Sequence, residues 1–220
     1  NSENSIVDLF KTRRYYELAV LANNIYHQLG QVADMPLTEY DFVVFNKDAD
    51  AVDSRKINDR NIDAVNNGKI RVILDNIRSP FNVGAFFRTG DAVGIDELYL
   101  CGITPTPENI RVTRAAMGAD KVMKWRYCRF AEAIVEDLKL RGTTKIFSVE
   151  TSSNCVRYDK PDYKNIKDIT FVFGNEEFGI NENIIRFSDC VIGIEMFGLK
   201  NSLNVAIAGG IVLYQYRMAV

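Results

Sequence analysis

The stretch Ile169-Thr-Phe-Val-Phe173-Gly174-Asn-Glu176-Glu177-Phe-Gly179 decides the fold. A short run of β-branched and aromatic residues stops at a glycine, which indicates a strand buried on both faces, as in a parallel sheet. Two glycines then bracket two acids. Ligands of parallel α/β sheets bind beyond the carboxyl ends of the strands. We therefore expect the turn at 174–179 to face a ligand crevice; the alternative is a plain strand-to-helix turn with solvated acids.

The same rhythm of short apolar runs and helical segments extends in both directions from this strand, from Ile70 to Met218. Six strands that alternate with helices predict an α/β fold whose mostly parallel sheet is covered by helices on both faces. Besides 169–173, strands are predicted at 71–75, 97–101, 122–125, 145–149 and 190–194, and helices at 82–93, 130–140 and about 202–218.

The first 67 residues lack this rhythm and are predicted to form a small helical N-terminal extension. Ser5 and Asp8 offer a helix start, and apolar residues recur after them at helical spacing. A change in composition near Asn67 marks the boundary. We therefore expect two parts, an extension at 1–67 and an α/β domain at 68–220.

Composition narrows the classes of function. No apolar run approaches the ~18 residues of a membrane span, and the first residues lack the segments of a signal peptide, so we predict a cytoplasmic protein without membrane contact. Four scattered cysteines and a single histidine, His27, argue against a metal site, a redox pair or a serine-histidine-aspartate triad. A net charge of −2 lends no support to nucleic-acid binding, although phosphate affinity depends on where the basic residues lie.

A second motif, at 82–89, follows the first predicted strand. Asn82 is placed to cap a helix, Gly84 permits close backbone approach, and Arg88 lies about one and a half turns further on. The planar fork of an arginine suits the grip on a phosphate. The alternative is a capped helix with a surface arginine. The motif is neither a Walker phosphate loop nor a G-x-G-x-x-G fingerprint.

A third motif, at 194–208, joins the last predicted strand to the last helix. Ser202 is the expected N-cap of that helix, and Asn204 then falls in its first turn, where capping does not explain it. Gly209 and Gly210 inside the helix cost about 1 kcal/mol each against alanine. We expect close packing of this helix against another helix to offset that cost. The second helix could belong to another subunit.

Taken together and in this order, the three motifs resemble those of the SpoU (TrmH) family of SPOUT methyltransferases. The resemblance covers residues 70–218 and includes a segment at 112–119. One departure is Glu195, where the family usually has a proline that would stiffen the loop. The matching residues are Asn82, Gly84, Arg88, Thr89, Gly174, Glu176, Gly179, Gly198, Ser202, Leu203, Asn204, Val205 and Ala208.

The resemblance implies a fold and a reaction. In this family the C-terminal part of the domain forms a deep trefoil knot that binds S-adenosylmethionine. The enzymes are homodimers, with an acceptor site built from both subunits, and an N-terminal extension often helps to hold RNA. The sulfonium carries its own charge, so no metal is needed. By motif position the cofactor contacts Val149, Glu150, Thr151, Gly174, Asn175, Ile194, Met196, Gly198 and Leu203.

The expected catalytic residues are Arg88, Asn82, Glu176, Ser202 and Asn204, with Arg88 central according to the resemblance. A guanidinium stays protonated below about pH 12. We therefore expect Arg88 to bind a substrate phosphate and to stabilise the developing alkoxide, while the proton leaves through that phosphate or a water. Glu176 would orient Arg88 or Asn82, and Ser202 and Asn204 would shape the acceptor pocket.

The predicted function is S-adenosylmethionine-dependent methylation of a ribose 2′-hydroxyl in tRNA or rRNA. The alternative is a catalytically inactive RNA-binding protein on the same scaffold. A dinucleotide-binding oxidoreductase would need a glycine-rich first turn after a strand, which the sequence lacks. RNA contact is predicted for Lys11, Arg13 and Arg14 in the extension and for Arg111, Arg114, Lys121, Lys124 and Arg126 after the second strand.

Overall fold

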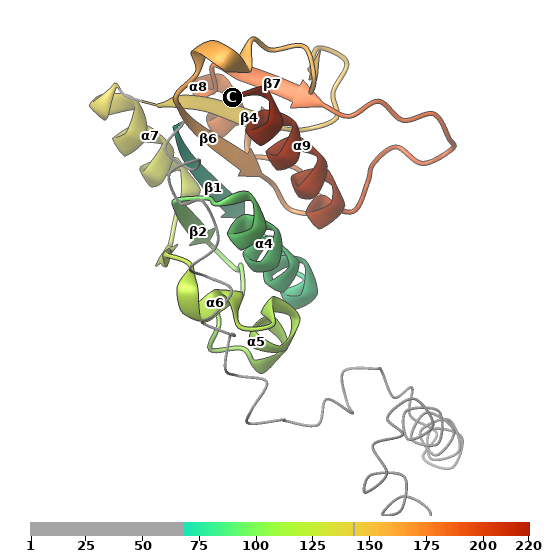
Figure 1. Ribbon diagram of the computed structural model, residues 1–220. Coiled ribbons are helices and arrows are strands. Elements are labelled where there is room, and N and C mark those ends of the chain that lie inside the picture. Colours follow the sequence, from blue (N-terminus) through green and yellow to red (C-terminus); the bar gives the residue numbers. More distant parts are fainter. Residues whose placement is uncertain (1–67, 143) are drawn as a thin grey trace, which may run out of the picture. The chain divides into compact units, whose positions relative to one another are not determined.

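The computed structural model describes residues 68–142 and 144–220 (Figure 1). Seven parallel strands form one sheet in the order β3-β2-β1-β6-β4-β7-β5. The strands are β1 (Lys69–Asp75), β2 (Glu97–Cys101), β3 (Trp125–Cys128), β4 (Lys145–Val149), β5 (Val156–Arg157), β6 (Asp168–Phe173) and β7 (Cys190–Gly193). The predicted α/β fold with a parallel sheet is confirmed, and the two-residue β5, too short to show a pattern, was not predicted.

Helices cover both faces of the sheet. On one face, α4 and α9 lie side by side, with α5 and α6 packed against α4; on the other lie α7 and α8 (Figure 1). The helices are α4 (Pro80–Val93), α5 (Ile110–Ala116), α6 (Ala119–Val122), α7 (Ala131–Arg141), α8 (Glu182–Phe187) and α9 (Val205–Ala219), with a 3-10 helix η3 (Tyr163–Asn165) before β6. No helix in the described part of the chain is long and apolar enough to cross a membrane.

The larger core cluster lies between the sheet and the face that carries α4 and α9. Phe86 of α4 packs on Phe173 at the end of β6, with ring centroids 4.9 Å apart. A side chain at Gly209 would collide with the ring of Phe86, so this glycine lets α9 approach α4 closely. Tyr216 is fully buried and donates a hydrogen bond to the carbonyl of Ile166 at 2.7 Å, which ties α9 to the segment before β6.

Three predicted boundaries are wrong. Residues 119–122 form a short helix, and the third strand begins only at Trp125. Helix α4 begins after Ser79, whose hydroxyl accepts the N–H of Asn82 at 3.4 Å, so Asn82 lies inside the helix and does not cap it. Helix α9 is capped by Asn204 and not by Ser202. At α4 and α9, the polar residues near the helix start allowed more than one cap, and local spacing did not choose between them.

Candidate active site

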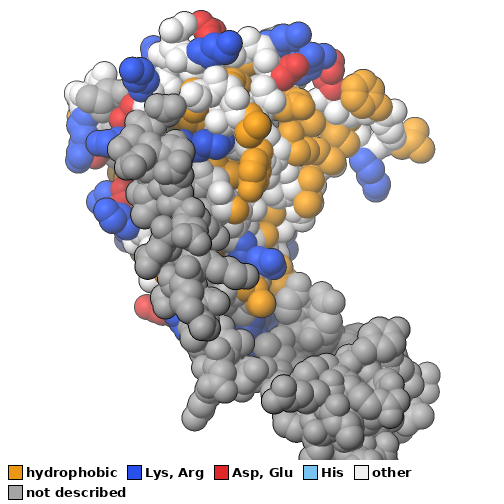
Figure 2. Space-filling view, viewed as in Figure 1, with side chains coloured by type: hydrophobic (Ala, Val, Ile, Leu, Met, Phe, Trp, Pro, Cys, Tyr) orange, Lys and Arg blue, Asp and Glu red, His pale blue; other side chains and the backbone are white. Residues whose placement is uncertain are grey.

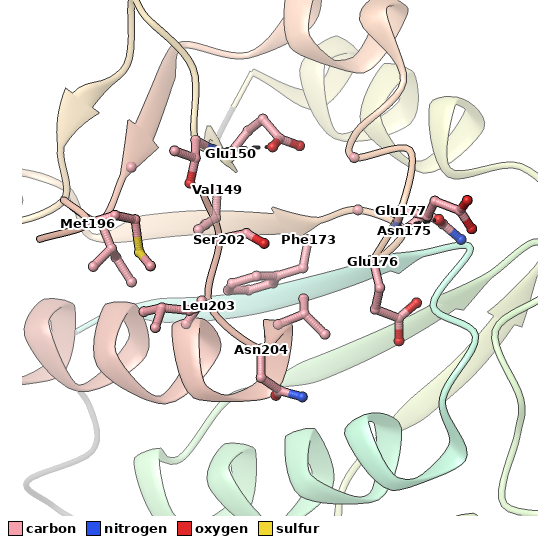
Figure 3. A pocket seen from close by; sticks show the side chains of 17 residues that line it. Val149, Glu150, Phe173, Asn175, Glu176, Glu177, Met196, Ser202, Leu203 and Asn204 are labelled. Carbon is pink, nitrogen blue, oxygen red and sulfur yellow. Dashed lines mark hydrogen bonds between the residues drawn. The ribbon is translucent and has the colours of Figure 1, made fainter. Parts of the chain in front are cut away.

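A pocket of about 460 Å³ opens where β4, β6 and β7 end and α9 begins. Its size is within the usual range for small-molecule sites. Figure 3 shows side chains from these strand ends and from the segment before α9 converging on it. The lining residues are Val149, Glu150, Thr151, Phe173, Gly174, Asn175, Glu176, Glu177, Gly179, Gly193, Ile194, Met196, Ser202, Leu203, Asn204, Val205 and Ala208.

The turn at 174–179 forms one wall, and its own hydrogen bonds hold it rigid. Asn175 and Gly179 exchange two backbone bonds, of 3.1 and 2.9 Å. The amide oxygen of Asn175 accepts the N–H groups of residues 177 and 178, and its Nδ2 donates to the carbonyl of Asn76 at 2.7 Å. A side chain at Gly174 would collide with the backbone of Gly179, which itself has φ +71°. Both glycines are therefore required by the local geometry.

Glu150 fastens this turn to the end of β4. Its Oε2 accepts the N–H of Ile180 at 3.0 Å, and its Oε1 accepts the N–H of Thr151 at 3.2 Å. Two segments of the pocket wall that are distant in sequence are thus held together by one carboxylate.

A chain of hydrogen bonds joins the three motifs. Glu176 Oε1 accepts from Asn82 Nδ2 at 2.9 Å, and Asn82 Oδ1 accepts from Asn204 Nδ2 at 3.0 Å. Asn204 Oδ1 in turn accepts the backbone N–H groups of Ala206 and Ile207, which caps α9. The role left open for Asn204 is thus twofold, because it caps the helix and also reaches Asn82.

The carboxylate of Glu176 lies at the start of α4. It accepts the backbone N–H of Arg78 at 2.9 Å and that of Ser79 at 3.1 Å, in addition to Asn82. Partial burial alone would raise the pKa of Glu176, but these hydrogen bonds outweigh it and lower the pKa below its usual value. Glu176 is therefore ionised at neutral pH, and it orients Asn82.

Arg88 lies outside this arrangement. It follows Asn82 by about one and a half turns of α4, or about 9 Å along the helix axis. Its side chain is exposed and does not line the pocket. Within residues 68–142 and 144–220 it makes no hydrogen bond or ion pair, so Glu176 does not orient it directly. Of the two partners predicted for Glu176, the structure has Asn82.

The residues predicted to bind the cofactor gather at the pocket, with one exception. Eight of the nine line it, and Gly198 lies in an exposed loop with open space where a side chain would extend. Ser202 lines the pocket as well. The predicted site residues did not include Phe173, Glu177, Gly179, Gly193, Val205 and Ala208, although Gly179, Val205 and Ala208 belong to the matching motifs. Phe173 and Gly193 are the last residues of β6 and β7, so the rule that ligands meet strand ends would have found them.

The loop that begins after β7 is held at Glu195. The carboxylate of Glu195 pairs with Arg157 of β5 at 3.3 Å, and Arg157 also pairs with Asp159. Where the resembling family has a stiffening proline, this chain has an ion pair between neighbouring strand ends.

Of the eight residues predicted to contact RNA, five lie within the described part of the chain. Lys11, Arg13 and Arg14 lie outside the described residues. Arg111, Lys121 and Lys124 are exposed, and Arg114 is half-buried. Arg126 makes two hydrogen bonds to the carboxylate of Glu97, of 2.7 and 2.9 Å, which offset its charge. No group of three or more potential metal ligands occurs in the described part of the chain.

Comparisons with known proteins match the part of the chain that forms the described α/β domain. The family described as SpoU rRNA Methylase matches residues 69–214. A tRNA (guanosine(18)-2′-O)-methyltransferase of Thermus thermophilus is 30% identical over 152 residues, which cover 66% of this chain and 73% of the relative. The enzyme of the same name from Escherichia coli is 30% identical, with 66% of this chain and 62% of the relative covered.

Among solved structures, the S-adenosylmethionine-bound rRNA methyltransferase from Sinorhizobium meliloti has a TM-score of 0.64 and 30% identity. The likeness covers 69% of this chain and 57% of that chain. The described domain thus matches a tRNA enzyme and an rRNA enzyme at equal identity.

Proposed function

The chain belongs to the SpoU rRNA methylase family of S-adenosylmethionine-dependent RNA methyltransferases, and we propose that it places a methyl group on a ribose 2′-hydroxyl of tRNA or rRNA. The observation that carries the proposal is the hydrogen-bonded chain Glu176–Asn82–Asn204 at the rim of the pocket. It brings the three sequence motifs together where a donor and an acceptor can meet.

The pocket residues fit S-adenosylmethionine. Gly174 and Gly193 leave no room for a side chain, so the backbone itself forms part of the cradle. Ile194, Met196 and Leu203 supply apolar surface, and the lining carboxylates suit a cation. When bound, S-adenosylmethionine supplies an activated methyl group on a positively charged sulfur. We assign its binding to the predicted residues that line this pocket, and we leave out Gly198.

The chain's own residues then have distinct tasks. Ionised Glu176 holds Asn82, and Asn82 holds Asn204, so the acceptor rim is rigid before RNA arrives. Ser202 faces the pocket beside it. Arg88 remains a cation and is proposed to bind the phosphate next to the target ribose and to stabilise the oxygen as its proton leaves. The proton passes to that phosphate or to a water.

Because Arg88 lies outside the pocket of its own chain, we propose that the acceptor site is completed in a homodimer. An apolar stripe on α9 supports this: Ile207, Tyr214 and Met218 recur at helical spacing and are 57%, 47% and 82% exposed. Gly210 also lies on open surface. Figure 2 shows hydrophobic side chains gathered on the face where α9 lies. Such patches mark interfaces.

Three further parts of the proposal concern the whole chain. We propose that the C-terminal segment threads through the preceding loops as a trefoil knot; its support is that α9 packs against both α4 and η3 after the chain has passed the ends of β4 and β6. Residues 1–67 are proposed to be a helical RNA-binding extension of the catalytic domain at 68–220. Lys11, Arg13 and Arg14 of the extension are proposed to contact RNA, and the protein is proposed to act in the cytoplasm.

The test of the activity uses the full chain with tritium-labelled S-adenosylmethionine and bulk tRNA and rRNA in parallel. We expect label in one of the two, resistant to alkali at one internucleotide bond, because a 2′-O-methyl group blocks cleavage there. Label on a base would contradict the proposal. RNA binding without transfer would favour the inactive RNA-binding protein.

The dimer proposal has its own test. Arg88→Ala and Asn204→Ala are each expected to be inactive. The first variant lacks the cation proposed to bind the phosphate, and the second lacks the asparagine that Asn82 holds beside the pocket. If each site takes Arg88 from one subunit and Asn204 from the other, an equimolar mixture that exchanges subunits regains about a quarter of the wild-type activity. A mixture as inactive as its components would contradict a shared site.

A further inference from the structure

The charge of the pocket lining is one-sided. Of the 17 described residues that line it, three are glutamates and none is lysine, arginine or histidine. The glutamates are Glu150, Glu176 and Glu177. A concave site with a single sign of charge concentrates its potential inside the pocket.

The three carboxylates differ in how their charge is offset. Glu177 pairs with Arg78 at 2.8 Å. Glu176 and Glu150 accept N–H donors but form no ion pair with any described residue, so no described cation offsets either carboxylate. Figure 3 shows Glu150 across the pocket from Asn204, away from the catalytic chain of hydrogen bonds. A substitution at Glu150 removes none of the hydrogen bonds that join Glu176, Asn82 and Asn204, although Glu150 does hold the turn at 174–179 that carries Glu176.

The reaction changes the charge of the pocket's ligand by one. The bond between the methyl carbon and the sulfonium breaks with its electron pair going to sulfur, a bond forms from the methyl carbon to the ribose oxygen, and the hydroxyl proton leaves. S-adenosylmethionine thereby becomes S-adenosylhomocysteine, a neutral thioether. The two ligands share the adenine, ribose, ammonium and carboxylate groups. Any difference in their affinity thus reports on the methyl group and its positive charge.

We propose that Glu150 makes the pocket prefer the cationic donor to the neutral thioether product, and so favours exchange of product for fresh donor after each transfer. The inference rests on the proposed function and deepens it. No direct contact with the sulfur is required, because at about 0.1 M salt charges are largely screened only beyond about 10 Å. An opposite charge at such range in a partly solvated site changes a binding constant by about three- to tenfold.

The rival role for Glu150 is mechanical. By accepting the N–H groups of Ile180 and Thr151, it holds the 174–179 turn to β4. If that were its whole contribution, its loss would loosen the pocket for both ligands equally. The ratio of the two affinities therefore separates charge from scaffolding.

The experiment is calorimetric titration of the full chain with three ligands: S-adenosylmethionine, S-adenosylhomocysteine, and sinefungin, in which an amine supplies the positive charge without a transferable methyl group. Glu150→Gln keeps the shape and one acceptor oxygen. We expect affinity for both cations to fall about three- to tenfold and affinity for the thioether to stay within about twofold. Glu136→Gln, on α7 at the other face of the sheet, is the matched control and should change none of the three.

A second measurement needs no variant. Raising salt from about 50 mM to about 0.5 M shortens the range of the charge, so the wild-type preference for the cations over the thioether should shrink. Equal loss for all three ligands in Glu150→Gln, or a preference that ignores salt, overturns the role of Glu150 while leaving the methyltransferase intact. Failure of the wild type to bind any of the three ligands would instead contradict the proposed function itself.

Discussion

The first turn of α4 and the middle of the same helix treat their polar side chains in opposite ways. Asn82 is 9% exposed and both of its amide atoms are engaged, one by Glu176 and one by Asn204. Arg88, on the same rigid helix, is exposed and has no described partner. A buried amide must find its hydrogen bonds within the fold. A guanidinium that is to grip an RNA phosphate must stay available until that phosphate arrives.

In the described chain, folding alone builds the pocket and the hydrogen bonds that join Asn82, Asn204 and Glu176, and it leaves Arg88 outside the pocket. Under the proposed dimer, one chain supplies only part of the acceptor site, and RNA and a second subunit bring Arg88 to it.

Arg88→Ala tests the role of the exposed arginine in the middle of α4. We expect methyl transfer to fall by at least about a hundredfold, since a charge that stabilises a developing oxyanion is lost. Affinity for S-adenosylmethionine and the free energy of unfolding should stay near wild type, because Arg88 is exposed and makes no hydrogen bond or ion pair with a described residue. Single-turnover transfer and calorimetry measure these; Arg186→Ala on α8 is the control. Retained turnover would refute the assignment.

Asn82→Ala tests the role of the buried asparagine in the first turn of α4. It leaves Glu176 and Asn204 without a shared partner, so we expect a loss of about 1–3 kcal/mol in the free energy of unfolding. Transfer should fall about tenfold or more, because the loss of residues that orient a site costs about that much. Urea unfolding and initial rates measure the two effects, with exposed Asn183→Ala as control.

A double-mutant cycle sharpens this result. Asn82→Ala and Asn204→Ala should be less than additive in stability, since they remove the same hydrogen bond. Strictly additive losses would show that the 3.0 Å contact contributes no coupling.

The two adjacent glycines of α9 lie on different faces of the helix: Gly209 is buried against Phe86, and Gly210 faces open space. Gly209→Ala should destabilise the protein by about 1–3 kcal/mol, because the added methyl group collides with Phe86. Gly210→Ala meets open space and should favour the isolated helix by about 1 kcal/mol. Thermal unfolding ranks the two, and sedimentation reports the effect of Gly210→Ala on the proposed dimer. Equal destabilisation by both would contradict the packing of α9 on α4.

Two carboxylates at the carboxyl ends of the neighbouring strands β1 and β6, those of Asp75 and Glu176, differ in how their pKa is shifted. Glu176 has a lowered pKa, as shown above, whereas burial, with some repulsion from Glu132, raises the pKa of Asp75 to about 6. The folded state then binds a proton more tightly than the unfolded state, whose Asp pKa is about 3.9. This contribution to stability is greatest below pH 4 and is lost as the pH rises to about 6.

Asp75→Asn should therefore remove a fall in stability between about pH 4 and 6, of the order of 1–3 kcal/mol. The variant keeps an oxygen that can accept from Asn76, as Asp75 does at 2.8 Å. Urea unfolding at several pH values compares it with the wild type. Parallel pH profiles for the two proteins would show that Asp75 titrates normally.

Much of the fold and of the candidate pocket was determined by the sequence alone. Short apolar runs that alternate with helical segments predicted six strands, and all but the strand at 122–125 lie close to where they were expected. The rule that ligands bind beyond strand ends predicted the pocket wall at 174–179. These inferences succeed because strand burial and glycine geometry are properties of a few adjacent residues.

Tertiary structure alone decided which polar side chains meet. Asn82 and Glu176 are 94 residues apart, and Asn82 and Asn204 are 122 apart. Local spacing offered Ser202 as a cap and Arg88 as a partner for Glu176 with equal logic. The choice fell to Asn204 and Asn82 because the sheet order and the packing of α9 on α4 bring those two side chains within hydrogen-bonding distance. The spacing of residues along the chain does not indicate how far apart two side chains lie in the folded structure.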